Sequence, residues 1–304
     1  MCAGASDGIA RCVFPYHARD PRQEEIIHVR PILFHLPFGL PLYGYGTMLF
    51  ASVVVGRRLA LRLAERAGMD ATVMDRCCLW TLAGAFVGAR LLYVVTNLDQ
   101  FHRLADVFQF WSGGMVAYGG FLGGFLVTVV WCRIYGVRLI AWADCATPSL
   151  CVGLLLTRVG CFLAGCDFGR PWDGPWAVRF PSGSPAFEQQ TLAGLLPLGA
   201  TQSLPVHPTQ LYESLSGLVL LLLVTAVHRR RTFRGQPFVA FVLGYAVLRY
   251  LIEIVRADAN RGGVGPFSTS QIIAVATFLA AAVLASALRR VRPRLPQTHP
   301  EVTA

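Results

Sequence analysis

Long apolar runs separated by shorter polar segments dominate the chain. Seven of these runs approach the ~20 residues that a helix needs to cross a bilayer. They cover residues 42–61, 78–96, 115–133, 139–157, 211–227, 238–254 and 271–288. The pattern predicts an all-α integral membrane protein with about seven transmembrane helices, and a loop region outside the membrane between the fourth and fifth.

Arginines gather in alternate segments along the order of these runs. The groups are Arg57, Arg58, Arg62 and Arg66; Arg133 and Arg138; Arg229, Arg230, Arg231 and Arg234; and Arg289, Arg290, Arg292 and Arg294. Cytoplasmic loops carry the excess of Lys and Arg in membrane proteins. We therefore expect the N-terminus outside, the C-terminus in the cytoplasm, and the long loop on the extracytoplasmic side of a bacterial inner membrane.

Composition supports the same fold class. Hydrophobic residues make up 54% of the chain and charged residues only 14%, against roughly 25% charged in a typical globular domain. The net charge of +10 could suggest nucleic acid, but the basic clusters fall between apolar runs instead of on a soluble basic face. We expect no nucleic-acid partner.

The two ends differ from the apolar centre. Residues 1–40 contain several prolines and mixed charges without the apolar core of a secretory signal. They predict a loosely structured N-terminal extension. Residues 291–304 form a polar, Pro-rich stretch that predicts a disordered cytoplasmic tail. The membrane domain is expected to cover residues 41–290.

The nine cysteines give no disulfide framework, and most lie in apolar runs, where a thiol acts as a small hydrophobe. Cys161 and Cys166 have C-x4-C spacing without a second Cys or His pair, so no metal site is predicted. No cofactor is expected either. The letters Leu-Ala-Gly-Cys ending at Cys166 are those of a lipoprotein signal, but such a signal belongs near the N-terminus.

A glycine-rich run opens the third apolar segment. Gly119 with Gly123 and Gly120 with Gly124 have the small-xxx-small spacing that lets membrane helices approach closely. No strand precedes the run, so a nucleotide-binding loop is disfavoured. We interpret these four glycines as packing residues.

Ionisable residues within apolar segments mark functional sites or pair with one another. In the sixth run, Tyr245, Arg249 and Glu253 recur at i,i+4 spacing and share one helix face. This spacing fits either a structural Arg–Glu bridge or the wall of an active site. Arg158 and Arg249 approach the outer part of the membrane, where their planar forks could grip a lipid phosphate.

Two further positions carry candidate chemistry. Arg90 lies within the second run beside small residues. His207 precedes Pro208 at the start of the fifth run and could be either a general base or a structural residue at the helix entrance; Gln210 and Glu213 follow it.

Together these residues resemble the phosphatidylglycerol:prolipoprotein diacylglyceryl transferases. The matching strings run in the family's order from about residue 43 to about residue 271. They are Tyr45-Gly46-x-Met48, Gly84-x3-Gly88-x-Arg90, Gly113-Gly114-x3-Tyr118-Gly119-Gly120, Arg158-x-Gly160, His207-Pro208-Thr209-Gln210-Leu211-Tyr212-Glu213 and Tyr245-x3-Arg249-x3-Glu253.

The resemblance implies a transferase of bacterial lipoprotein biosynthesis. Such an enzyme moves the diacylglyceryl group of phosphatidylglycerol onto the lipobox cysteine of a prolipoprotein and releases glycerol phosphate. It implies that Arg158 and Tyr45 contact the lipid, with Glu253, Arg90 and Gln210 in the binding site. Tyr245 and Arg249 would be catalytic. A single copy of the chain suffices.

This chain departs from the family pattern where the family usually has His, Asn and Glu. Tyr118 replaces the histidine of the Gly-Gly motif, and Cys161 and Cys166 replace the Asn and Glu that follow the Arg-x-Gly motif. Tyr is a poor base for a thiol because its ordinary pKa is about 10. The proton acceptor could be Tyr118, Tyr245 or His207. An inactive or altered-substrate paralogue that binds phospholipid or lipoprotein precursors is the alternative, and a transporter is disfavoured because no internal repeat is found.

Overall fold

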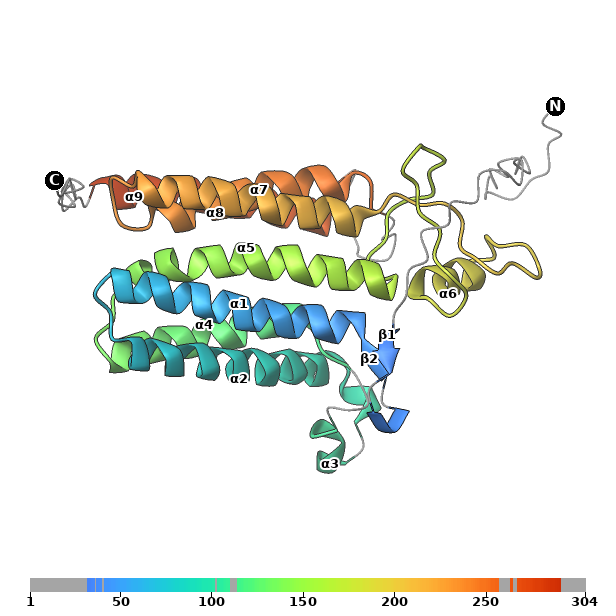
Figure 1. Cartoon of the computed structure of the whole chain (residues 1–304), viewed down its shortest axis with the longest axis horizontal. Coiled ribbons are helices and arrows are strands. Elements are labelled where there is room, and N and C mark those ends of the chain that lie inside the picture. The colour runs from blue at the N-terminus through green and yellow to red at the C-terminus, as the bar shows by residue number, and fades with distance from the viewer. Residues whose placement is uncertain are drawn as a thin grey trace.

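The computed structural model describes residues 32–35, 37–39, 41–101, 103–109, 114–256, 263–264 and 267–290. Most of the chain between residues 44 and 290 is helical (Figure 1). The long helices are α1 (Gly44–Arg66), α2 (Ala71–Thr96), α4 (Ala117–Ile134), α5 (Leu139–Ala164), α7 (Thr209–Arg229), α8 (Gln236–Glu253) and α9 (Thr269–Arg290). Each contains most or all of one predicted apolar run, which confirms the all-α membrane fold.

Six of these helices are long and apolar enough to cross a membrane: α2, α4, α5, α7, α8 and α9. The α1 helix is long enough, but Arg57 and Arg58 interrupt its apolar sequence. It nevertheless packs lengthwise against α5 (Figure 1). Six candidate spans among the described residues are therefore shown, and a seventh span at α1 remains a prediction.

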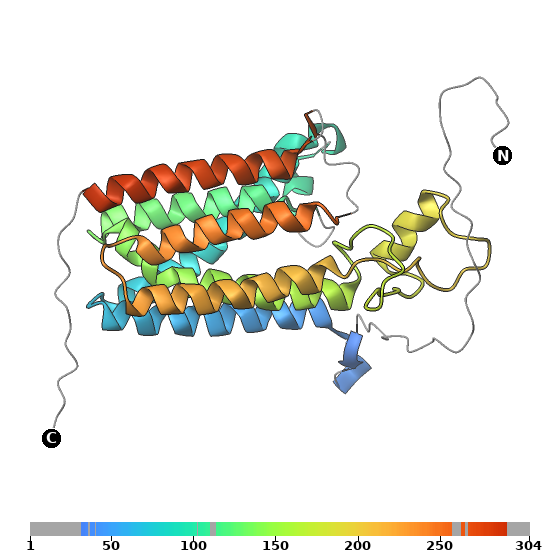
Figure 2. The ribbon, with the colours of Figure 1, turned by 90° about the horizontal axis from the view of Figure 1, so that it is seen from above.

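The α5 helix is at the centre of the bundle, because it packs on α1 at one side and on α7 at the other. The α8 helix then packs on α7, and α9 on α8, as two views show (Figures 1 and 2). The α2 and α4 helices form a separate close pair. Local signals set the ends of these helices: the Asp70 carboxylate accepts a hydrogen bond from Val73 N at 3.0 Å and caps α2, and Gly165 ends α5 with φ 75°.

The glycines predicted to pack helices do so. A Cβ at Gly88 of α2 would overlap the backbone oxygen of Gly119 in α4, and one at Gly123 would overlap that of Gly84. Gly120 and Gly124 also face α2, within van der Waals range of residues of that helix. The two backbones therefore touch directly along this seam, as in other small-xxx-small helix pairs.

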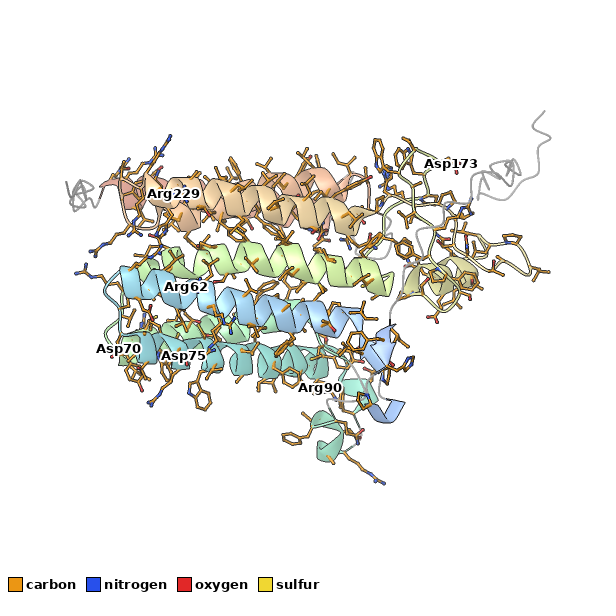
Figure 3. All side chains as sticks on the ribbon, in the orientation of Figure 1. Arg62, Asp70, Asp75, Arg90, Asp173 and Arg229 are labelled. Carbon is orange, nitrogen blue, oxygen red and sulfur yellow. The ribbon has the colours of Figure 1, made fainter. Side chains whose placement is uncertain are left out.

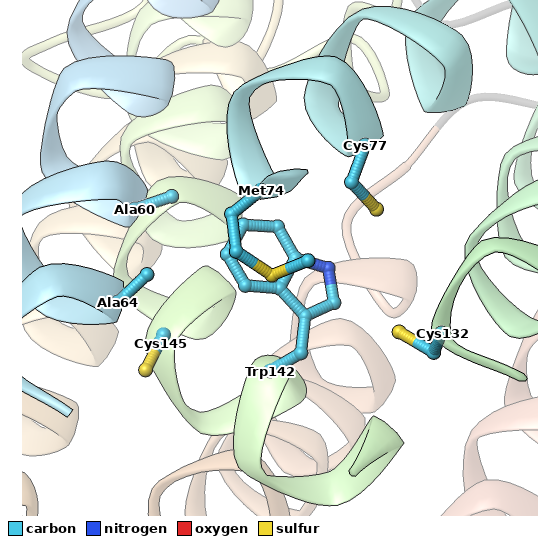
Figure 4. Close-up of a cluster of buried hydrophobic side chains, with 7 residues drawn as sticks. All are labelled: Ala60, Ala64, Met74, Cys77, Cys132, Trp142 and Cys145. Atoms are coloured by element: carbon cyan, nitrogen blue, oxygen red, sulfur yellow. The ribbon is translucent and has the colours of Figure 1, made fainter. Parts of the chain in front are cut away.

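A buried cluster fills one end of the bundle (Figure 4). It consists of Ala60, Ala64, Met74, Cys77, Cys132, Trp142 and Cys145. Its cysteines are free and fully buried among apolar side chains, which confirms their role as small hydrophobes. Cys2 and Cys12 lie outside the described residues.

The described members of the predicted Arg-rich groups collect at this same end, where α1, α4, α7 and α9 finish. Figure 3 places Arg62 and Arg229 there, together with Asp70 and Asp75, and places Arg90 and Asp173 toward the opposite end. Asp144, which the sequence places near this end, is buried; it accepts hydrogen bonds from Gly235 N at 2.7 Å and Phe238 N at 3.3 Å. This carboxylate therefore anchors the start of α8.

The polar stretch between α5 and α7 is a folded unit with its own core. Short bridges join residues such as Val178 and Val206, and α6 (Pro185–Leu192) packs beside them. The core contains Phe168, Val178, Phe180, Ala186 and Val206. We call residues 165–208 the head; it lies beyond the end of the bundle opposite the Arg-rich end (Figure 2).

Small elements complete this end. They are β1 (Ile32–His35) paired antiparallel with β2 (Pro41–Tyr43), the 3-10 turns η2 (Pro37–Gly39) and η3 (Leu98–Gln100), the helix α3 (Leu104–Val107), and β3 (Gly263–Val264) paired with β4 (Phe267–Ser268). The sequence pattern predicted none of them. Residues 1–31 and 291–304, expected as an extension and a tail, lie outside the described residues.

Candidate active site

Charged side chains from several helix ends meet where the bundle joins the head. Arg158 comes from the last turns of α5, Glu213 from the second turn of α7, and Arg249 and Glu253 from the last turns of α8. Two residues beyond helix ends complete the group, Asp167 after α5 and Arg256 after α8. We call these six residues the charged cluster.

Four members of the cluster form a closed ring of ion pairs. Glu213 binds Arg158 Nε through one carboxylate oxygen and Arg256 Nη1 through the other, the latter at 2.8 Å. Asp167 binds the same two arginines, with its oxygens 2.7 Å from Arg158 Nη1 and 2.9 Å from Arg256 Nη2. Each acid thus bridges both guanidinium groups, and each guanidinium group contacts both acids.

Arg249 extends the ring toward α9. Its Nη2 lies 2.7 Å from a Glu253 oxygen and 3.3 Å from Ser270 Oγ, while Ser268 Oγ donates to Glu253 at 3.0 Å. Its Nη1 lies 3.6 Å from Glu213 Oε1, too far for a hydrogen bond. Among the described residues, no hydrogen-bond acceptor reaches this buried nitrogen.

The cluster is balanced in charge but not in hydrogen bonds. Three arginines face three acids, so the buried and half-buried charges compensate one another, as intramembrane charges generally must. Guanidinium groups, however, have five N–H donors each, and no described residue accepts from Nη2 of Arg158. Donors on Arg158 and Arg249 remain for an anionic ligand, and bidentate contact with phosphate oxygens is a favoured use of such groups.

Tyrosines surround the cluster. Tyr245 lies one turn before Arg249 in α8. Tyr45, at the start of α1, packs against Gly160 of α5, two residues beyond Arg158. Tyr118 in α4 also interacts electrostatically with Tyr245, although its side chain is 62% exposed. The structure therefore brings these three predicted tyrosines to one region.

Gln210 is buried under the cluster in the first turn of α7. Its Nε2 donates to Cys166 O at 2.6 Å, and its Oε1 has no hydrogen-bond partner among the described residues. A buried amide oxygen without a partner is uncommon because its desolvation is not compensated. Gln210 can accept a hydrogen bond from a ligand hydroxyl.

His207 lies in the head and packs among aromatic rings. Its ring stacks on Trp172 with centroids 4.2 Å apart, and its Nδ1 is 3.2 Å from the hydroxyl of Tyr212. Burial lowers the pKa of His207 below its ordinary value, which favours the neutral ring at pH 7. None of these contacts reaches the charged cluster, which favours the structural alternative for this residue.

Arg90 lies apart from the charged cluster. Its guanidinium group donates to the backbone oxygens of Val107, Gly114, Asp106 and Gln109 at 2.8–3.1 Å. These carbonyls belong to the segment that links α2 to α4. The contacts support a role in holding that segment, and Gly113 of the same motif lies outside the described residues.

Three cluster members were not predicted as site residues: Glu213, Arg256 and Asp167. Glu213 ends the His-Pro-Thr-Gln-Leu-Tyr-Glu string, and Arg256 lies one turn beyond Glu253, so both had a signal in the sequence. Asp167 had none, because only the turn at Gly165 brings it back toward Arg158.

Cys161 and Cys166 lie beside the ring. One Asp167 oxygen and the two Sγ atoms lie within 4.8 Å of one another, which is close enough for a metal to draw them together. Both oxygens of Asp167, however, already pair with arginines. A cation there would face two guanidinium groups, so the geometry gives little support to a metal, and its absence remains a prediction.

Comparisons with known proteins point to one family. A family model described as prolipoprotein diacylglyceryl transferase matches residues 31–287. Three proteins named phosphatidylglycerol--prolipoprotein diacylglyceryl transferase are similar to the chain. The one from Geobacter sulfurreducens is 34% identical over 271 residues, covering 86% of this chain and 96% of the relative. The one from Methylococcus capsulatus is 34% identical over 258 residues, covering 82% and 91%. The one from Clostridium tetani is 28% identical over 251 residues, covering 83% and 94%.

Proposed function

The chain belongs to the prolipoprotein diacylglyceryl transferase family, and from this membership we propose how its charged cluster performs the family's reaction. It is a membrane-embedded transferase whose substrates are phosphatidylglycerol and prolipoproteins. The mechanism rests on one observation. Arg158 and Arg249 have N–H donors for which the described residues offer no acceptor, and they lie beside a ring of ion pairs whose charges balance.

Arg158 and Arg249 bind the phosphate of phosphatidylglycerol in this proposal. Nη2 of Arg158 and Nη1 of Arg249 supply the N–H groups, for which the described residues offer no acceptor. Gln210 accepts a hydrogen bond from a glycerol hydroxyl through its free oxygen. Tyr45 packs two residues beyond Arg158 and Glu253 pairs with Arg249, so both contribute to the same binding site, while Arg90 acts from outside it by holding the segment before α4.

The reaction exchanges one carbon–oxygen bond for a carbon–sulfur bond. The prolipoprotein cysteine attacks, as its thiolate, the glycerol carbon that carries the phosphate. The carbon–oxygen bond to phosphate breaks, a thioether forms, and glycerol phosphate leaves with the electron pair. Negative charge grows on the leaving phosphate, where Arg158 and Arg249 stabilise it. Ground-state binding and leaving-group stabilisation therefore use the same two side chains.

The thiol proton must go to another group because Tyr118 replaces the usual histidine. Tyr245 is our candidate, since it lies one helical turn before Arg249 in α8, whereas the ring of His207 contacts Trp172 and the hydroxyl of Tyr212. Tyr118 remains a second candidate through its interaction with Tyr245. A neutral tyrosine must lose its own proton to accept another, so the path is a relay. The thiol proton passes to the acceptor oxygen while the proton of that oxygen passes to the departing glycerol phosphate.

We infer that the chain lies in the bacterial inner membrane with the head outside. The Arg-rich ends of α1, α4, α7 and α9 support a cytoplasmic location for the opposite end. The N-terminus would then be extracytoplasmic, the C-terminus cytoplasmic, and α1 the seventh span. One copy of the chain contains the whole cluster, and no nucleic acid is required. A cytoplasm-dependent reporter fused after Ala304 should be active, and an inactive fusion would reverse the assignment.

A bacterial strain depleted of its own transferase tests the function. Expression of this chain should restore the mobility shift of a reporter lipoprotein, and Arg249→Ala should abolish it, because the phosphate loses its main buried donor. Arg62→Ala, an exposed arginine at the far end, is the matched control and should restore the shift fully. Parent-level lipidation by Arg249→Ala would contradict the mechanism. A well-expressed parent chain that restored no shift would favour the inactive paralogue.

A further inference from the structure

Asp167 has an unusual backbone for the position it occupies. It directly follows the turn that ends α5 and has φ 57°, and no other described non-glycine residue has a positive φ. Left-handed backbone is uncommon for residues with a Cβ, although Asp and Asn tolerate it better than most. The conformation turns its carboxylate back toward the last turns of α5.

That carboxylate contacts the phosphate-binding arginine directly. One oxygen accepts from Arg158 Nη1 at 2.7 Å, while the other pairs with Arg256 Nη2 at 2.9 Å. Glu213 pairs with the remaining edge of Arg158, at Nε. Two of the three guanidinium nitrogens of Arg158 are thus held by acids from different segments. A planar group held at two nitrogens cannot rotate, and its third nitrogen points in one fixed direction.

The two acids of the ring differ in exposure. The side chain of Glu213 is 5% exposed and that of Asp167 is 30% exposed. Glu213 is therefore the buried acid of the ring, and Asp167 is the acid nearer the surface. Because Arg256 binds both acids, it links Asp167 and Glu213 to the end of α8.

We propose that Asp167 is a positioning residue that sets the orientation of Arg158 for phosphatidylglycerol; this inference rests on the proposed function. The left-handed backbone at Asp167 lets its carboxylate reach the guanidinium group of Arg158.

The structure offers a closely matched variant. Asp167→Asn keeps the shape of the side chain and the tolerance for left-handed backbone but removes the charge. Asp167→Gly, which adopts positive φ freely, is the second variant should the first not fold. Asp173→Asn changes an exposed acid of the same head and is the control.

Binding of a fluorescent phosphatidylglycerol to the full-length purified chain in nonionic micelles tests the inference without requiring turnover. Asp167→Asn should weaken binding about tenfold, since charge-assisted hydrogen bonds are among the stronger ones. Asp173→Asn should bind like the parent. Arg158→Lys removes the planar guanidinium group that Asp167 would orient. In that background, Asp167→Asn should change binding less than about twofold, because the effects of substituting two residues that act through one another do not add.

Two results would overturn the positioning role. One is parent-like binding by Asp167→Asn. The other is an equal loss in the parent and Arg158→Lys backgrounds, which would mark a general structural effect. A parent chain that bound no phosphatidylglycerol would instead contradict the proposed function itself. A parent that binds, an Arg158→Lys variant that binds weakly and an unaffected Asp167→Asn variant would contradict only this inference.

Discussion

At the scale of single residues, Arg158, Arg249, Glu253 and the tyrosines were predicted as site residues from sequence, whereas Glu213, Asp167 and Arg256 were not. Ionisable residues in an apolar run are conspicuous, so Arg158, Arg249 and Tyr245 stood out. The ring that holds them depends on which helix ends meet in space. Asp167 shows the limit most clearly, because a single left-handed turn decides where its carboxylate points.

The proton acceptor is the residue-scale question that substitution can answer. Tyr245→Phe removes only a hydroxyl and should lower the transfer rate by about 10²-fold, a typical loss for a missing general base. Tyr250→Phe, five residues further along α8, is the matched control. His207→Phe keeps a ring that can stack on Trp172 and should transfer at a rate within a few-fold of the parent.

Initial rates with a lipobox peptide at saturating phosphatidylglycerol distinguish these outcomes. A parent-like rate for Tyr245→Phe together with a severe loss for His207→Phe would reverse the assignment. Such a result would place the proton path in the head instead of in the bundle.

At the scale of elements, hydropathy predicted every long helix, because a run of about 20 apolar residues has few other stable forms in a membrane. The head was predicted only as a loop. Its core of Phe168, Val178, Phe180, Ala186 and Val206 is assembled from residues without a helical or strand period. Isolated bridges hold it together, and these leave no repeating pattern in the sequence.

The contact between α2 and α4 makes an element-scale prediction. Gly88→Ala places a methyl group against the Gly119 carbonyl, so the helices must separate. We expect a loss of about 1–3 kcal/mol of stability, the usual cost of overpacking. Gly153→Ala in α5 is the control, because no atom lies within 4 Å of its added Cβ. Thermal unfolding in detergent measures both, and equal midpoints for the two variants would contradict direct backbone packing.

At the scale of the whole molecule, the arginines at the two ends of the bundle serve different purposes. Arginines at one end follow the topology of the bundle, while Arg158, Arg249 and Arg256 at the other end pair with three acids. A largely buried ion-pair network of this kind is weak evidence for stability alone, since apolar residues often stabilise as well. The unused donors on Arg158 and Arg249 favour retention of the network for binding an anion.

The central claim is that this chain transfers lipid despite lacking the usual histidine, and one measurement tests it most directly. The purified full-length chain is mixed with phosphatidylglycerol and a lipobox peptide, and the intact mass of the peptide is followed over time. We predict a mass increase of one diacylglyceryl group on the cysteine, with one glycerol phosphate released per peptide modified. An unchanged peptide mass with a correctly folded chain would contradict the account.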